Sequence, residues 1–135
     1  MHLETSFVVS RSRDEVVDIL FHDESLIALL PGRSEIIARD GQRKTTSTQF
    51  TGLGQGGTAI FHFDFLQDGR IRFEKECDGV VWEELSGEMR VDEGSETRVW
   101  ISMQGRTRPQ VPEFAIKSPM EDQLLQMTEA LEALL

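Results

Sequence analysis

The 135-residue chain contains a single cysteine, Cys77, which excludes an internal disulfide and a zinc site built from several cysteines. Its longest apolar run, residues 26–30, is far shorter than the about 20 residues that a membrane-spanning helix needs. The N-terminus lacks the basic and apolar segments of a secretory signal. Internal repeats and low-complexity tracts are also missing. We therefore expect a soluble, cytoplasmic protein that folds as one unit.

Basic residues are few as well. The 14 Lys and Arg residues oppose 24 Asp and Glu residues, so the formal net charge is −10. Such a surface repels phosphate, which argues against general nucleic-acid or anionic-membrane binding. The hydrophobic content of 39%, with eight Phe and two Trp, can still supply a core for a single domain.

The first third of the chain predicts a strand and two short helices. Residues 1–9 alternate loosely between polar and apolar, as a strand does. Ser12 and Glu15 form a capping box at the start of a helix. Asp23 is placed to cap a second helix, which Pro31-Gly32 ends.

Hairpin turns dominate residues 34–105, where about six consecutive strands are predicted. The turn dipeptides are Asp40-Gly41, Gly56-Gly57, Asp68-Gly69, Asp78-Gly79 and Glu93-Gly94. A second capping box at Ser118-Pro119 predicts a helix from Pro119 to the end of the chain. Its apolar stripe consists of Met120, Leu124, Met127, Leu131 and Leu134.

A three-residue loop, 67–69, predicts the register of the next hairpin, because it places the apolar residues of both strands on one face. The predicted inner pairs are Phe65 with Ile71, Phe63 with Phe73, and Phe61 with Lys75. The outer face then pairs Asp64 with Arg72 and His62 with Glu74, as a solvated surface would.

Beyond this hairpin the expectations depend on turn lengths. A two-residue Asp78-Gly79 turn would place Lys75 opposite Trp82. The apolar residues then change parity, which predicts a bulge near Glu83–Glu84. A five-residue loop, 92–96, would set Met89 opposite Val99 and Leu85 opposite Met103.

A helix about 10 Å wide cannot fill a bent sheet of six strands spaced by about 4.8 Å. The geometry therefore leaves interior volume that either large side chains or a small apolar ligand fills.

The element order and the opening motifs resemble the START-like (SRPBCC) superfamily, the helix-grip fold that includes polyketide cyclase/dehydratase-like and CoxG-like proteins. The resemblance rests on Phe7-Val8-Val9, residues 12–20, Asp23 and Leu29-Leu30-Pro31-Gly32; it departs at Val17, where members often carry Trp or Phe. It implies an α+β fold in which 6–7 antiparallel strands bend around a long C-terminal helix, with residues 1–135 as one START-like domain. It also implies a hydrophobic pocket between sheet and helix.

Several motifs favour a structural interpretation over chemistry. The glycines of residues 52–57 lie between two strands, unlike those of a dinucleotide loop, which precede a helix. His62 and Asp64 share the outer face, Cys77 is expected to be buried, and neither Ser86 nor Ser102 has an obvious His–Asp pair. The sequence predicts neither a metal site, nor a cofactor, nor a catalytic residue.

Two cationic features qualify for ligand contact. Lys75 carries the one charge on the inner face of its strand, with Glu84 as the nearest partner, although its charge can instead lie over Trp82 and reach water. Arg106 and Arg108 lie in the segment that ends the last strand, at the expected cavity mouth or on a solvated rim. The candidate ligand-binding residues are Phe61, Phe63, Phe65, Phe73, Lys75, Trp82, Met103, Arg106, Leu124 and Met127.

The sequence thus predicts a non-catalytic binder of a small lipophilic or amphipathic ligand. Two alternatives stay open: a polyketide cyclase-like enzyme, which needs an acid or base inside the cavity, and a protein-interaction module with a filled core. An open cavity or a filled one discriminates between them. Ligand identity and oligomeric state are beyond what the sequence predicts.

Overall fold

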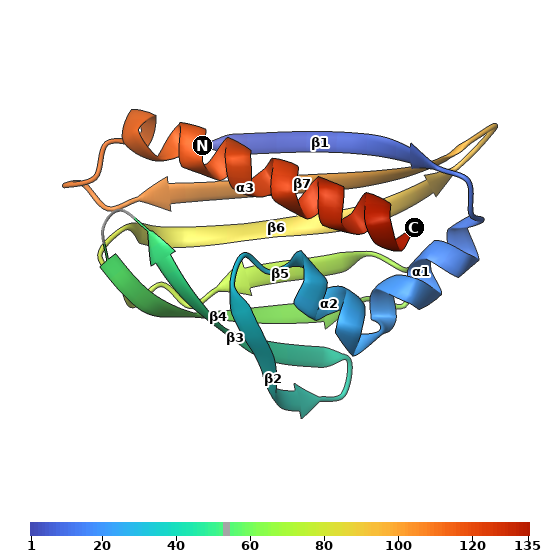
Figure 1. Cartoon of the computed structure of the whole chain (residues 1–135), viewed down its shortest axis with the longest axis horizontal. Helices are drawn as coiled ribbons and strands as arrows, with labels where there is room; N and C mark the ends of the chain where they lie inside the picture. Colours follow the sequence, from blue (N-terminus) through green and yellow to red (C-terminus); the bar gives the residue numbers. More distant parts are fainter. Residues whose placement is uncertain (53–54) are drawn as a thin grey trace.

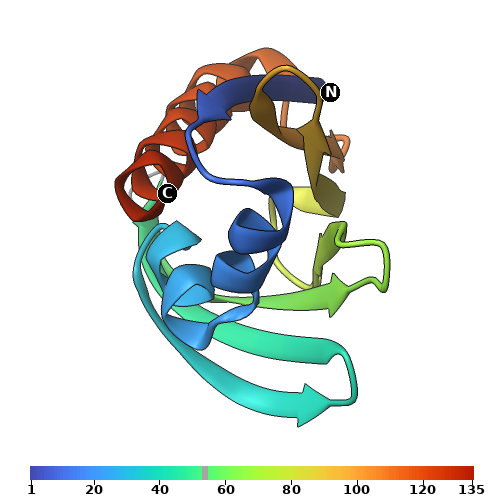
Figure 2. The same cartoon turned by 90° about the vertical axis from the view of Figure 1, so that its right-hand side faces the viewer.

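The computed structural model describes residues 1–52 and 55–135. Its described part contains a seven-stranded antiparallel sheet in the order β1-β7-β6-β5-β4-β3-β2, and three helices (Figure 1). Figure 2 shows the sheet curling around α3, with α1 and α2 at one end. This is the predicted α+β helix-grip arrangement. The elements are β1 (His2–Val9), α1 (Arg13–Phe21), α2 (Asp23–Leu29), β2 (Arg33–Asp40), β3 (Arg43–Gly52), β4 (Gln55–Phe65), β5 (Ile71–Lys75), β6 (Trp82–Glu93), β7 (Thr97–Thr107) and α3 (Glu113–Leu134).

The two short helices begin differently. At α1 the predicted cap is confirmed, since the Ser12 hydroxyl accepts a hydrogen bond from the Glu15 amide at 3.3 Å. At α2 the predicted cap is wrong: His22 occupies the N-cap position, and Asp23 is the first helical residue. The Asp23 carboxylate binds Lys44 and Arg39 instead, because cations on neighbouring strands offer stronger partners than backbone amides do.

The predicted β4–β5 register is confirmed in full, with Phe63 opposite Phe73 and Asp64 opposite Arg72. The Leu66 amide donates to the Arg70 carbonyl across the three-residue loop, and Gly69 adopts a φ of 90°, as predicted. The phenylalanines of β4 point to the side of the sheet that the helices cover and are buried, with Phe65 packed edge-on against Phe21 of α1. We call this side of the sheet the inner face and the opposite side the outer face.

The predicted Asp78-Gly79 turn is wrong. Glu74 pairs with Ser86, so Lys75 does not lie opposite Trp82, and residues 76–81 form a longer connection. The Arg108 guanidinium donates to the carbonyls of Cys77 and Gly79, at 2.9 and 2.8 Å. These long-range hydrogen bonds stabilise the open connection at the expense of the tight turn that the local sequence favours.

The β6–β7 hairpin is partly as predicted. The bulge occurs at the expected place, between Trp82 and Glu84. The loop is shorter than expected, however, and Met89 pairs with Ile101, two residues from its predicted partner. The shorter loop allows Asp92 and Glu93 to pair with β7. Because the register differs from the predicted one by two residues, every side chain stays on its predicted face.

Helix α3 begins six residues before the predicted start, with Pro112 at its N-cap, so Pro119 lies inside the helix. The early start has a packing reason: it brings Ile116, which is 4% exposed, into the core. The stripe of Met120, Leu124, Met127 and Leu131 is buried as predicted, whereas Leu134 is half-buried. Among the described residues, no helix is both long and apolar enough to cross a membrane.

Candidate functional site

An apolar cleft lies where the sheet, the end of α2 and the middle of α3 meet. Its volume is about 20 Å³, which is room for about one water molecule. The interior space expected between sheet and helix is therefore almost filled by side chains. The lining residues are Leu29, Leu30, Pro31, Phe61, Phe63, Phe73, Leu85, Met103, Gln123 and Met127.

Three phenylalanines form the sheet side of the cleft. Ring centroids lie 6.2 Å apart for Phe61 and Phe63 and 5.8 Å apart for Phe63 and Phe73, with tilted planes. Phe73 lies against Gly87, its partner on β6, where an added Cβ would be only 2.2 Å from the ring. Glycine is therefore required at position 87 for this aromatic wall to pack.

Half of the predicted ligand-binding residues line the cleft: Phe61, Phe63, Phe73, Met103 and Met127. Phe65, Trp82 and Leu124 are buried in the core outside the cleft lining. The sequence interpretation missed Leu29, Leu30, Pro31, Leu85 and Gln123. The first three had been assigned only to the end of a helix, and their position over the sheet follows from the packing of α2 against α3.

The predicted cations lie away from the cleft. Lys75 is opposite Phe61 as expected, but its ammonium donates to the Glu76 carbonyl at 3.0 Å in an exposed position. Arg106 is on the outer face, where its Nε lies 2.8 Å from a carboxylate oxygen of Glu83. Its side chain is 64% exposed. Neither residue lies within the lining, whose one polar member is Gln123.

Among the residues whose burial the structure describes, the buried cation of the inner face is Lys44, which the sequence interpretation missed. Its ammonium donates to the Phe21 carbonyl at 2.5 Å and to Asp23 at 2.9 Å. It also lies over the rings of Phe21 and Phe65, at 4.3 and 4.9 Å from their centroids. The hydrogen bond from Lys44 is the main reason that the pKa of Asp23 is lowered. Lys44 therefore fastens the α1–α2 junction to the sheet.

A hydroxyl, an imidazole and a carboxylate align on the outer face. His62 Nδ1 lies 2.8 Å from Thr45 Oγ1, and His62 Nε2 lies 2.8 Å from Glu76 Oε1. This order resembles a nucleophile–base–acid triad. Thr45 is buried, however, in β3 between β2 and β4, where backbone amides pair with neighbouring strands and do not form an oxyanion hole. The chain of hydrogen bonds joins β3, β4 and the residue that follows β5.

The remaining motifs have structural positions. The predicted Gly56-Gly57 turn is wrong: both glycines lie in β4, paired with Thr51 and Phe50 of β3, because the strand ladder extends to the Gly52–Gln55 pair. Leu53 and Gly54 lie outside the described residues. Cys77 was expected to be buried but is half-buried, with its Sγ 3.4 Å from the Lys75 carbonyl. Within the part of the chain that the structure describes, no cluster of three or more His, Cys, Asp or Glu is arranged to hold a metal ion.

No protein-family model and no curated protein sequence matches the chain. Solved structures do resemble it. The Zhui aromatase/cyclase from a Streptomyces species aligns with a TM-score of 0.82 and 16% identity, over 98% of this chain and 92% of that one. The protein TTHA0849 from Thermus thermophilus aligns with a TM-score of 0.77 and 15% identity, over 99% of this chain and 96% of that one. A START superfamily protein from Mycobacterium smegmatis aligns with a TM-score of 0.74 and 16% identity, over 98% of this chain and 94% of that one.

These likenesses confirm the helix-grip fold of START-like proteins that the sequence predicted. At such identities they establish the fold alone, and function has to be argued from the cleft.

Proposed function

We propose that this protein binds a small apolar or amphipathic molecule in the cleft between the sheet and α3. The observation that carries the proposal is the composition of the lining: nine of the ten lining residues are apolar, and the tenth is Gln123 at a half-buried position. Apolar concave sites with few polar groups are typical of small-molecule binding. The similarity to a START superfamily protein supports the same proposal.

Binding requires the cleft to widen beyond its present volume of about 20 Å³. Met103 and Met127 line it from the sheet and from α3. Methionine is unbranched and changes rotamer at little cost, so it can yield space to a ligand without moving the backbone. The proposed ligand enters between α3 and the turn that contains Leu30 and Pro31.

Native mass spectrometry of freshly purified protein tests whether a lipophilic molecule is retained. A titration with 1-anilinonaphthalene-8-sulfonate, an amphipathic fluorescent probe, tests binding directly. Gln123→Trp should obstruct the cleft and weaken probe binding at least about tenfold, a loss of about 1.4 kcal/mol. Gln126→Trp places the same bulk on an exposed position of α3 and should leave binding unchanged.

A filled core is the second candidate, and the small cleft volume favours it. In that case the protein acts through its surface as an interaction module. The absence of a retained molecule, together with unsaturable probe fluorescence in the unmodified protein and in Gln126→Trp, would support this candidate and contradict ligand binding.

An enzymatic role, as in the aromatase/cyclase that shares the fold, needs a positioned acid or base. The cleft offers only the carboxamide of Gln123. We therefore place binding ahead of catalysis.

A further inference from the structure

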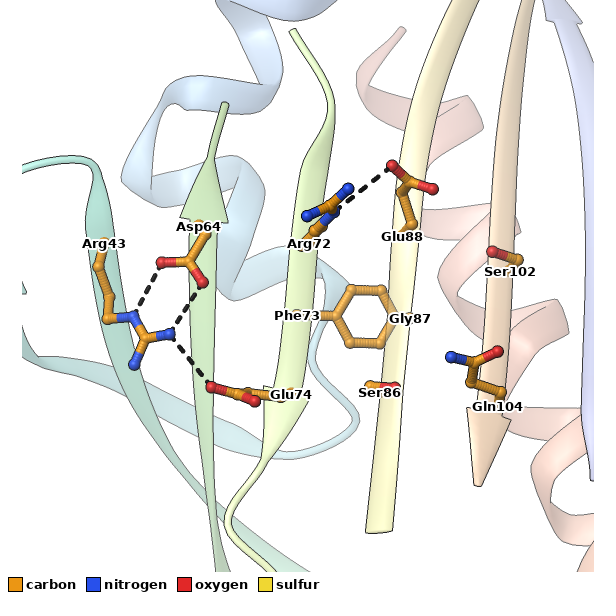
Figure 3. Close-up of a pocket in the computed structure, with 10 residues that line it drawn as sticks. All are labelled: Arg43, Asp64, Arg72, Phe73, Glu74, Ser86, Gly87, Glu88, Ser102 and Gln104. Carbon is orange, nitrogen blue, oxygen red and sulfur yellow. Dashed lines mark hydrogen bonds and ion pairs between the residues drawn. The ribbon is translucent and has the colours of Figure 1, made fainter. Parts of the chain in front are cut away.

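A second concavity lies on the outer face, with the sheet between it and the apolar cleft. Its volume is about 380 Å³, within the range of about 300–1,000 Å³ typical of small-molecule sites. Figure 3 shows its side chains, which come from five adjacent strands, β3 to β7. We call it the outer hollow. Its lining residues are Arg43, Asp64, Arg72, Phe73, Glu74, Ser86, Gly87, Glu88, Ser102 and Gln104. Of these, Phe73 is a buried inner-face residue that also lines the apolar cleft.

Short side chains create the hollow. Ser86 and Ser102 occupy neighbouring outer-face positions of β6 and β7, with Ser86 paired to Gln104 and Ser102 paired to Glu88. The surrounding outer-face positions carry longer side chains, and the charged ones stand as walls around this low floor (Figure 3). Gln104, the partner of Ser86, borders the two serines, and we count its carboxamide with the floor groups.

The charged side chains that form the walls of the hollow are paired with side chains of opposite charge. Arg43 holds Asp64 with two hydrogen bonds, of 2.8 and 2.9 Å, and Glu74 with a third of 3.1 Å. On the opposite wall, Glu88 is 3.1 Å from Arg70 and 3.9 Å from Arg72. A bound anion would have to compete with these carboxylates for the arginines, and a bound cation would have to compete with the arginines.

The floor groups stand outside this network. Among the ten residues drawn in Figure 3, the hydrogen bonds and ion pairs join Arg43, Asp64, Glu74, Arg72 and Glu88, and none reaches Ser86, Ser102 or Gln104. Hydroxyls and a carboxamide each donate and accept hydrogen bonds, and they carry no charge. They complement a ligand whose own groups also do both.

We propose that the outer hollow binds a small, neutral, polyhydroxylated molecule, a monosaccharide or cyclic polyol. Ligand hydroxyls would bond the floor groups Ser86, Ser102 and Gln104, while outer oxygens of Glu74 and Glu88 accept and the guanidinium of Arg72 donates at the walls. Arg72 is suited to this because its side chain is 58% exposed and lies only loosely against Glu88.

The test is a titration of the full chain, labelled with ¹⁵N, followed by amide chemical shifts. The probes are myo-inositol and D-glucose, with sodium sulfate as the anionic comparator. We expect saturable shifts from at least one of the two neutral probes, centred on residues 86–88 and 102–104, with a dissociation constant in the millimolar range that suits so small a ligand. Sulfate should give no saturable shifts at these residues.

Two variants make the test specific. Ser102→Phe fills the floor from a solvent-facing strand position and should weaken binding at least tenfold. Ser47→Phe places the same ring on the outer face of β3, outside the hollow lining, and should not change it. If Ser102→Phe fails to fold, Gln104→Leu serves as a second variant: it removes the Gln104 carboxamide from an exposed position and should also weaken binding.

Several outcomes would overturn the proposal: no saturable shifts with either neutral probe, shifts spread over the whole chain, equal affinity in Ser102→Phe and Ser47→Phe, or saturable sulfate binding in place of polyol binding. Because these substitutions lie on the other side of the sheet from the apolar cleft, binding of the fluorescent probe should be unaffected by them. Failure of either proposal therefore leaves the other intact.

Discussion

At the scale of single residues, Lys44 shows how a charge is retained in the core of this protein. Its side chain is 11% exposed, and both partners of its ammonium come from the α1–α2 junction. Two aromatic rings cover the rest of the ammonium. An isolated buried ammonium would be costly, and these contacts compensate for the water that it loses.

Substituting Lys44 with Met should lower the free energy of unfolding by about 1–3 kcal/mol, because the Phe21 carbonyl and the Asp23 carboxylate both lose their charged donor. Lys117→Met is the matched control: Lys117 is 65% exposed and lies 4.0 Å from Glu121, so its loss should cost less than about 0.5 kcal/mol. Urea titrations measure both. Equal losses in the two variants would contradict the role assigned to Lys44.

The Arg43–Asp64 pair predicts a pH dependence. The hydrogen bonds from Arg43 hold the pKa of Asp64 below its ordinary value. A carboxyl whose pKa is lower in the folded than in the unfolded protein stabilises the fold above the unfolded pKa, which is about 3.9 for Asp. This stabilisation is lost as the pH falls through the lowered pKa of the folded protein. Arg43→Met should therefore be less stable than the unmodified protein at pH 7, with the difference shrinking below about pH 4. Urea titrations at both pH values test this, and a difference that stays constant with pH would exclude the pair as its source.

At the scale of elements, α3 packs against β1 and α2, and it is longer than the sequence predicts. The Ser118-Pro119 pair is a good local start signal, yet the helix runs from Glu113 through Pro119. Proline lacks the amide that would bond the Ala115 carbonyl, so the helix forgoes a hydrogen bond there. Burial of Ile116, equivalent to about 1.5–3 kcal/mol, offsets that loss.

The orientation of α3 is tested by two alanine substitutions on opposite sides of it. Leu124→Ala removes a side chain that is 6% exposed and should cost about 2–5 kcal/mol. Glu129→Ala changes an exposed position and should be near neutral. Chemical denaturation gives both values, and similar losses would mean that a different face of the helix packs on the sheet.

At the scale of the whole molecule, the sheet curls around the three helices (Figure 2). Side chains nearly fill the cleft between the sheet, α2 and α3, which has a volume of about 20 Å³. A protein of this construction can hold a ligand only by exchanging side-chain contacts for ligand contacts. Stability and binding at the cleft should consequently change in opposite directions when a lining side chain is shortened.

Met127→Ala and Met120→Ala separate these effects, since both methionines are buried on α3 but only Met127 lines the cleft. Each should lower the free energy of unfolding by about 2–5 kcal/mol. Met127→Ala alone should also tighten binding of 1-anilinonaphthalene-8-sulfonate, because it enlarges the cleft. Tighter binding in both variants would indicate general loosening of the core. Unchanged binding in both would indicate that the cleft does not open.

The sequence by itself determined those features that depend on residues close together in the chain. The α1 cap, the β4–β5 register with its Gly69 loop and the bulge in β6 follow from local spacing, because period-two alternation and a short turn leave one face for each side chain. The phenylalanine wall of the cleft followed from the same alternation.

Only the tertiary structure decided the features that depend on distant partners. Arg108 stabilises the open connection 76–81 by donating to carbonyls about 30 positions away in the sequence. Asp23 does not cap α2, because its carboxylate accepts a hydrogen bond from Lys44 of β3. The placement of Leu30 and Gln123 over one cleft, and of Ser86 and Ser102 beneath one hollow, likewise arises when separate elements pack. Such contacts leave no local signature, because the energy that selects them comes from groups brought together only when the chain folds.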